Sequence, residues 1–90
     1  MKSLLISFSL DDPNSDYERI SSQIKRESKW ARITKNTWIV ITENSISDLR
    51  SSLRSSIEDR GKILIIDVTG ASWGTYAVSR RVTDWMKQNL

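Results

Sequence analysis

The chain has 90 residues, which is enough for one domain with one hydrophobic core and too few for two. Hydrophobic residues make up 38% of the chain and charged residues 28%, as in a globular domain rather than a linker or fibre. The absence of cysteine and histidine excludes disulfides, thiolate chemistry, zinc sites and imidazole general bases. Fourteen basic and eleven acidic residues give a net charge of +3, which favours polyanionic partners.

The first apolar run, Leu4–Phe8, is typical of a buried strand and gives way to the turn-forming residues Asp11–Asn14. Serines interrupt the run, which is too short to span a membrane and lacks the small-residue cleavage site of a secretory signal. We therefore expect a cytoplasmic protein with no membrane partner.

A helix and a hairpin are predicted next. The segment Ser15–Glu18 resembles a capping box, and apolar residues then recur at helical spacing from Tyr17 to Ile24. The β-rich runs Trp30–Thr34 and Thr37–Thr42 are separated by two residues that suit a tight hairpin turn.

The second half of the chain repeats this alternation. Ser45 is expected to start a helix whose apolar stripe extends to Ile57, and Gly61 to stop it. Lys62–Val68, apolar at successive positions and bounded by glycines, is the clearest strand in the sequence. A C-terminal helix is predicted around Val78–Met86, either capped by Ser79 or starting just before it.

This order, βαββαβ with an additional C-terminal helix, predicts an α+β fold of the ferredoxin-like, split βαβ type as a single domain over residues 1–90. Right-handed crossovers would place both crossover helices on one face of the sheet. Residues of both alternating sets are apolar in the strands Thr37–Thr42 and Lys62–Val68, so the second face also needs covering. A partner chain or the C-terminal helix is expected to cover it.

Short motifs occur along the chain at Ile6–Asp11, Tyr17 at the start of a helix, Asn36–Val40, Leu64–Gly70, and Trp73 with Gly74. Together they resemble those of the small bacterial and phage proteins called SinR-like, which are similar in turn to the CRISPR-associated Cas-two proteins and to VapD-type toxins. The resemblance implies a ferredoxin-like homodimer, joined through sheets or edge strands across a two-fold axis. The wider group includes metal-dependent nucleases and a non-catalytic dimer that holds duplex DNA.

The nuclease-type members of that group carry an aspartate at the end of their first strand, where this chain has Ser9. Asp11 and Asp12 follow two and three residues later, and the inferred topology places them at the opposite end of the sheet from Asp67. Strand ends lie about 17–20 Å apart, too far for these carboxylates to share one ion. We expect no catalytic residues and no cofactor, and magnesium would require ligands from a dimer mate.

Cationic side chains gather in two places that suit contacts to nucleic-acid phosphates. The residues that we predict to bind nucleic acid are Arg50 and Arg54, one helical turn apart, and Lys29, Arg32 and Lys35 around the hairpin. A solvated protein surface is the alternative reading of each group. Among the four tryptophans, Trp30 is predicted to stack on a base or contact a partner and Trp73 to contact a partner.

The sequence thus favours a non-catalytic homodimer that binds nucleic acid or a protein partner. One alternative is a divergent metal-dependent endonuclease or toxin of the same group. Another is a phage- or plasmid-borne inhibitor that docks on a host defence protein.

Overall fold

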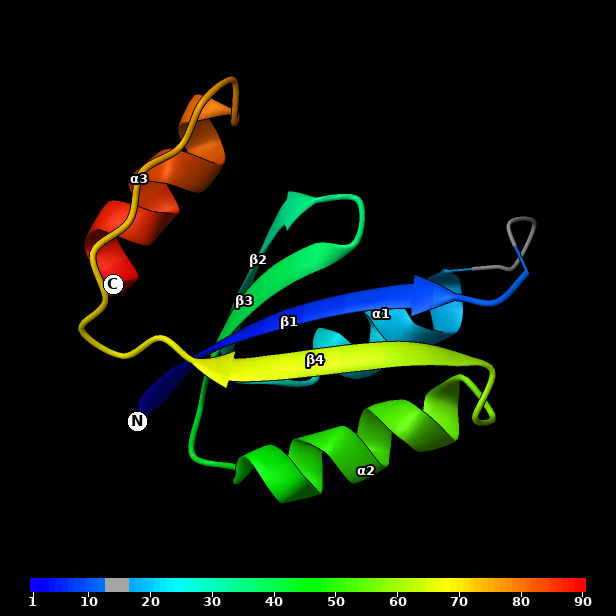
Figure 1. Ribbon diagram of the computed structural model, residues 1–90. Helices are drawn as coiled ribbons and strands as arrows, with labels where there is room; N and C mark the ends of the chain where they lie inside the picture. The colour runs from blue at the N-terminus through cyan, green and yellow to red at the C-terminus, as the bar shows by residue number, and fades with distance from the viewer. Residues whose placement is uncertain (13–16) are drawn as a thin grey trace.

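The structure is a computed structural model that describes residues 1–12 and 17–90, and it is a small α+β domain (Figure 1). Within these residues four strands form one antiparallel sheet, accompanied by three helices. In chain order the elements are β1 (Lys2–Leu10), α1 (Glu18–Ile24), β2 (Lys29–Thr34), β3 (Thr37–Thr42), α2 (Ile46–Ser56), β4 (Gly61–Asp67) and α3 (Arg80–Asn89). The predicted α+β class and element order are confirmed.

The sheet has the strand order β2-β3-β1-β4, so β1 is central and β2 and β4 form the two edges. β1 is antiparallel to β3 and to β4, with Leu4 opposite Asp67 and Leu10 opposite Gly61. The predicted separation of the acidic residues is therefore confirmed, because Asp11 follows one end of β1 and Asp67 pairs near the other.

One face of the sheet carries the hydrophobic core. Alternate residues of β1 and β3 point to this face, where α1 and α2 add their apolar stripes. The buried cluster consists of Leu4, Ile6, Phe8, Ile20, Ile24, Trp38, Val40, Leu49 and Leu53. We call this the helix face.

The second face is covered only in part. In Figure 1 the segment after β4 leads to α3, which packs against β2 and buries Met86 together with Ala31 and Ile39. At the other edge Leu64 and Ile66 remain 55% and 46% exposed. The C-terminal helix thus covers the β2–β3 side of this face and leaves the β4 side open. None of the helices within residues 1–12 and 17–90 is long and apolar enough to cross a membrane.

The predicted helix starts at Ser45 and Ser79 are confirmed. The Ser45 hydroxyl accepts a hydrogen bond from the Asp48 N–H at 3.0 Å, and Ser79 accepts one from the Val82 N–H at 3.3 Å. α1 begins at Glu18 without a side-chain cap on Tyr17. The remainder of the predicted capping box, like the turn at residues 13 and 14, lies outside the described residues.

The predicted stop signal of α2 was wrong. The helix ends at Ser56, and the chain turns through Glu58 and Asp59, whose φ angles of 55° and 61° are left-handed. Gly61 instead begins β4, where a Cβ atom would lie 2.6 Å from the Ser9 carbonyl oxygen. Glycine is therefore needed here for close strand packing and not for ending the helix.

Candidate nucleic-acid interface

Positive charge is concentrated in residues 25–35, which contain five lysines and arginines and one glutamate. This segment carries +4 while the whole chain carries +3, so the remaining residues together carry −1. The segment contains β2, an edge strand of the sheet. The single glutamate, Glu27, is engaged elsewhere, since its Oε1 accepts hydrogen bonds from Thr42 and Asn44.

Cationic side chains lie over the aromatic rings of β2 and β3. The register pairs Trp30 with Val40 and Arg32 with Trp38, which places Trp30 and Arg32 on the helix face. The Trp30 and Trp38 ring centroids lie 5.5 Å apart. Lys25 Nζ lies 5.2 Å from the Trp30 ring, and the Arg32 guanidinium 5.3 Å from the Trp38 ring.

The hairpin turn continues this arrangement toward α1. Lys35 Nζ lies 4.9 Å from the centroid of Tyr17, the residue before α1, and Tyr17 contacts the Phe8 ring at 5.8 Å. Arg32 links β2 to the hairpin turn, because its Nε and Nη2 groups donate hydrogen bonds to the Lys35 carbonyl oxygen at 3.2 and 2.9 Å. We call the surface formed by Tyr17, Lys25, Trp30, Arg32 and Lys35 the cation–aromatic strip.

Some of these aromatic rings are accessible to solvent and others are buried. Trp30 is 39% exposed and Tyr17 is partly exposed, whereas Trp38, which packs against Trp30, is buried. The three cations of the strip are exposed. The strip therefore offers two accessible rings, each covered by a lysine, on a rigid base.

The structure divides the predicted nucleic-acid-binding residues. Arg32 and Lys35 belong to the strip, whereas Lys29 points to the opposite face, where its Nζ contacts Asn89 Oδ1 of α3 at 3.3 Å. Arg50 and Arg54 line a groove at the β4 edge, which β3 and β1 separate from β2. Arg54 forms an exposed ion pair with Asp59.

Trp73 lies in the segment between β4 and α3 and is 37% exposed. It lines an apolar groove of about 240 Å³ between the second face of the sheet and α3, together with Leu5, Ile39, Val68 and Met86. The two tryptophans predicted to contact partners therefore lie on different surfaces.

Among residues 1–12 and 17–90 no three acidic side chains come together in a group that could hold a metal ion. Hydrogen bonds from the side chain and backbone of Thr69 lower the pKa of Asp67, which is therefore ionised at neutral pH and engaged locally.

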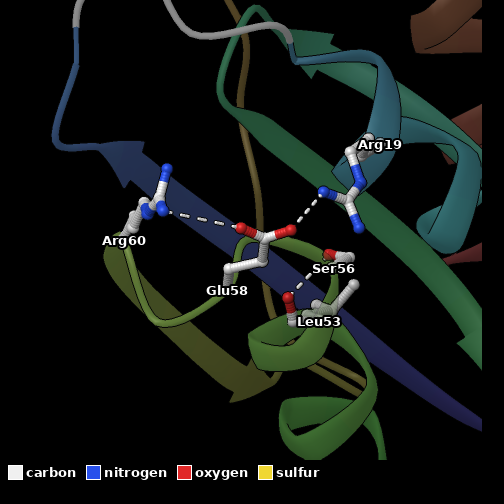
Figure 2. Close-up of polar contacts among 5 residues, drawn as sticks. All are labelled: Arg19, Leu53, Ser56, Glu58 and Arg60. Carbon is white, nitrogen blue, oxygen red and sulfur yellow. Dashed lines mark hydrogen bonds and ion pairs between the residues drawn. The ribbon is translucent and has the colours of Figure 1, made fainter.

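A polar cluster joins α1 to the turn after α2 (Figure 2). Glu58 Oε1 lies 2.7 Å from Arg19 Nη1, and Oε2 lies 3.8 Å from Arg60 Nη2. The hydrogen bond and charge of Arg19, with the charge of Arg60, lower the pKa of Glu58. Because Glu58 is exposed and ionised, this cluster links structural elements and offers no general acid.

Comparisons of the chain with protein-family models, with curated proteins and with solved structures find no match.

Sequence reasoning missed two members of the strip, Tyr17 and Lys25. Helical spacing assigns Tyr17 to the apolar stripe of the first helix, and Lys25 is not among the residues predicted to bind nucleic acid. Their proximity to the hairpin depends on the packing of α1 beside β2, which local spacing does not reveal. The high density of cations from residue 25 to residue 35 was the available signal.

Proposed function

We propose that this chain is a cytoplasmic, non-catalytic protein that binds single-stranded nucleic acid through the cation–aromatic strip. The observation that carries the proposal is the pair of lysines held over solvent-accessible rings, Lys25 over Trp30 and Lys35 over Tyr17. Aromatic platforms beside flexible cations suit a strand whose bases are free to stack and whose phosphates lie alongside.

The interaction free energies favour replacement of each lysine over its aromatic ring by a nucleic-acid base. An exposed cation–π contact contributes about 0.5–1 kcal/mol, whereas stacking of a base on an aromatic side chain contributes about 1–3 kcal/mol. A base can therefore displace the lysine from the ring, and the released ammonium group can reach a neighbouring phosphate. Arg32 stays anchored to the Lys35 carbonyl and keeps further N–H donors for a second phosphate.

A single strand suits this surface better than a duplex. The bases of a duplex are stacked on one another and paired, so their faces are not available to Trp30 or Tyr17. Phosphate contacts alone give no preference for sequence. We expect sequence-tolerant binding of RNA or DNA strands.

The ferredoxin-like assignment belongs to the same proposal. It is supported by the alternation of strands and helices and by the two crossovers, β1-α1-β2 and β3-α2-β4, whose helices pack on one face. Membership of the SinR-like and Cas-two-like group rests on the short motifs alone. The homodimer that this resemblance implies is part of the same proposal, and the exposed apolar residues Leu64 and Ile66 at the β4 edge support it.

A protein partner is the second candidate. It is favoured by the exposed apolar residues outside the strip, Leu64, Ile66 and Trp73. An inhibitor of a host defence protein would dock through this side of the sheet and leave the strip free.

Titration of the protein with single-stranded oligonucleotides, followed by tryptophan fluorescence in the presence of a chelator, tests the proposal. Stacking on Trp30 is expected to quench the emission at low salt. Repeating the titration with magnesium or manganese and checking oligonucleotide length on a gel distinguishes binding from cleavage, and metal-dependent shortening would favour the endonuclease alternative. Unchanged emission, with a host protein retained on immobilised chain, would favour the protein-partner candidate.

A further inference from the structure

Asn36 lies in the hairpin turn between β2 and β3, next to the cation–aromatic strip. Its backbone carbonyl oxygen accepts a hydrogen bond from the Phe8 N–H at 3.1 Å, which extends the pairing of β1 with β3 by one residue. Because side chains alternate along a strand, the Asn36 side chain points to the helix face, as that of Trp38 does. Asn36 and the strip therefore share one face of the sheet.

The side-chain oxygen of Asn36 is a buried acceptor. Asn36 Oδ1 accepts no hydrogen bond from any group within residues 1–12 and 17–90, although most buried polar atoms in proteins have a partner. Trp38 Nε1 is also buried without a partner among these residues, but Trp38 is 1% exposed and belongs to the core. Asn36 as a whole is partly exposed, so a bound molecule can reach its amide group from the surface.

The neighbours of Asn36 place it beside the Tyr17 ring. The ring of Phe8, the residue paired with Asn36, contacts the Tyr17 ring at 5.8 Å. Lys35 precedes Asn36 in the turn and holds its Nζ 4.9 Å from the centroid of the Tyr17 ring. A base that replaces Lys35 over Tyr17 therefore brings its own sugar to the hairpin turn that contains Asn36.

We propose that Asn36 Oδ1 accepts a hydrogen bond from the ribose 2′-hydroxyl of the nucleotide stacked on Tyr17, so that the strip prefers RNA to DNA. This inference rests on the proposed function and names the class of strand that the site takes. Binding of DNA would leave the amide oxygen without a donor, whereas RNA supplies one.

The choice of donor follows from the tolerance of the strip for any sequence. Stacking and phosphate contacts do not select a base, so the donor to Asn36 must be present on every nucleotide. No single donor of the bases meets this condition, since uracil has no amino group and adenine and cytosine have no ring N–H. The 2′-hydroxyl is present on every ribonucleotide and is absent from DNA.

The acceptor is held in place before the strand binds. Arg32 donates two hydrogen bonds to the Lys35 carbonyl oxygen, and the Phe8 N–H donates to the carbonyl oxygen of Asn36 itself. These bonds fix the turn from both sides, which limits the conformational freedom that Asn36 loses on binding. Pairing one such buried acceptor is expected to tighten binding about tenfold.

Oligouridine strands of one length test the donor from the side of the ligand, because uridine excludes base amino groups. Anisotropy in the presence of a chelator compares the ribose strand with its deoxyribose and 2′-fluoro counterparts, and a fluorine has no proton to donate. The ribose strand is expected to bind about tenfold tighter than either counterpart. A 2′-fluoro strand that binds as tightly as the ribose strand would show that sugar conformation sets the preference and would overturn the inference.

Two further outcomes separate this inference from the proposed function. Equal affinity for the ribose and deoxyribose strands would overturn the preference for RNA and leave the proposed function in place. No binding of any strand at low salt would overturn both.

Asn36→Ala tests the acceptor from the side of the protein. The φ angle of Asn36 is not left-handed, so alanine fits the turn, and the variant is expected to melt like the wild type because Oδ1 has no partner among the described residues. The ratio of ribose to deoxyribose affinity should fall from about ten to about one. Gln88→Ala removes an exposed amide from α3 and should keep the wild-type ratio. An Asn36→Ala protein that retains the full preference for RNA would overturn the inference, and the comparison of strands decides it if this variant does not fold.

Discussion

The Trp30 ring lies against the Trp38 ring at 5.5 Å with an interplanar angle of 53°, and of the two only Trp30 is accessible to solvent. Trp38 is part of the core, so it fixes the position of Trp30 from beneath. The exposed ring is thereby held ready to stack without losing conformational freedom on binding, which favours affinity.

Trp30→Ala is therefore expected to weaken binding of a single strand by about 5- to 150-fold, the equivalent of about 1–3 kcal/mol of stacking. Fluorescence anisotropy of a labelled oligonucleotide measures this change. Trp73→Ala is the matched control, since Trp73 is 37% exposed against 39% for Trp30 and lies outside the strip. Equal losses in the two variants would show that Trp30 has no specific role.

Removing the two ring-covering lysines tests the phosphate contacts. Lys25→Gln with Lys35→Gln should reduce affinity and make the log–log dependence on salt shallower by about 1.4, since each single-strand phosphate contact contributes about 0.7. Arg50→Gln with Arg54→Gln removes the same charge at the opposite edge of the sheet and should leave the slope unchanged. If instead the arginine variant alone loses the salt dependence, the binding surface is on α2.

The sequence was sufficient for the elements and the core face, because residues such as Leu4, Ile6 and Leu53 repeat at strand or helix spacing. The site could be predicted only in part. Arg32, Lys35 and Trp30 stand close together along the chain, whereas Tyr17 reaches them through tertiary packing. Arg50 was predicted to bind nucleic acid as the hairpin cations were, because local spacing does not show which edge of the sheet a helix lies beside.

The ion pairs of Glu58 give the domain a specific response to acid. The pKa of Glu58 is lower in the folded than in the unfolded chain, so these pairs stabilise the fold above the ordinary glutamate range. This stabilisation is lost as the pH falls through the lowered pKa. The melting temperature of wild type should exceed that of Glu58→Gln near neutral pH, and the difference should vanish in strong acid.

Glu43→Gln is the control for this measurement, because Glu43 is exposed and has no ion pair among residues 1–12 and 17–90. Its melting temperature should follow that of wild type at every pH. A Glu58→Gln protein that shows a constant difference down to strong acid would contradict an electrostatic origin.

A backbone conformation in the segment before α3 gives a further prediction. Ala77 has a φ of 59°, a left-handed value that costs a residue with a Cβ atom about 1–2 kcal/mol. Ala77→Gly should raise the free energy of unfolding by up to about 1 kcal/mol, after allowance for the greater freedom of glycine in the unfolded chain. Ala71→Gly, exposed and without positive φ, should lower the free energy of unfolding slightly in the same denaturation experiment.

The most direct test of the central claim is the affinity of the wild-type protein for one labelled strand, measured by anisotropy across a range of salt, beside its duplex. The account predicts binding at low salt with a log–log slope of about −2, as expected for three phosphate contacts, and clearly tighter binding of the single strand than of the duplex. Undetectable binding at low salt, or an affinity that is independent of salt, would contradict it.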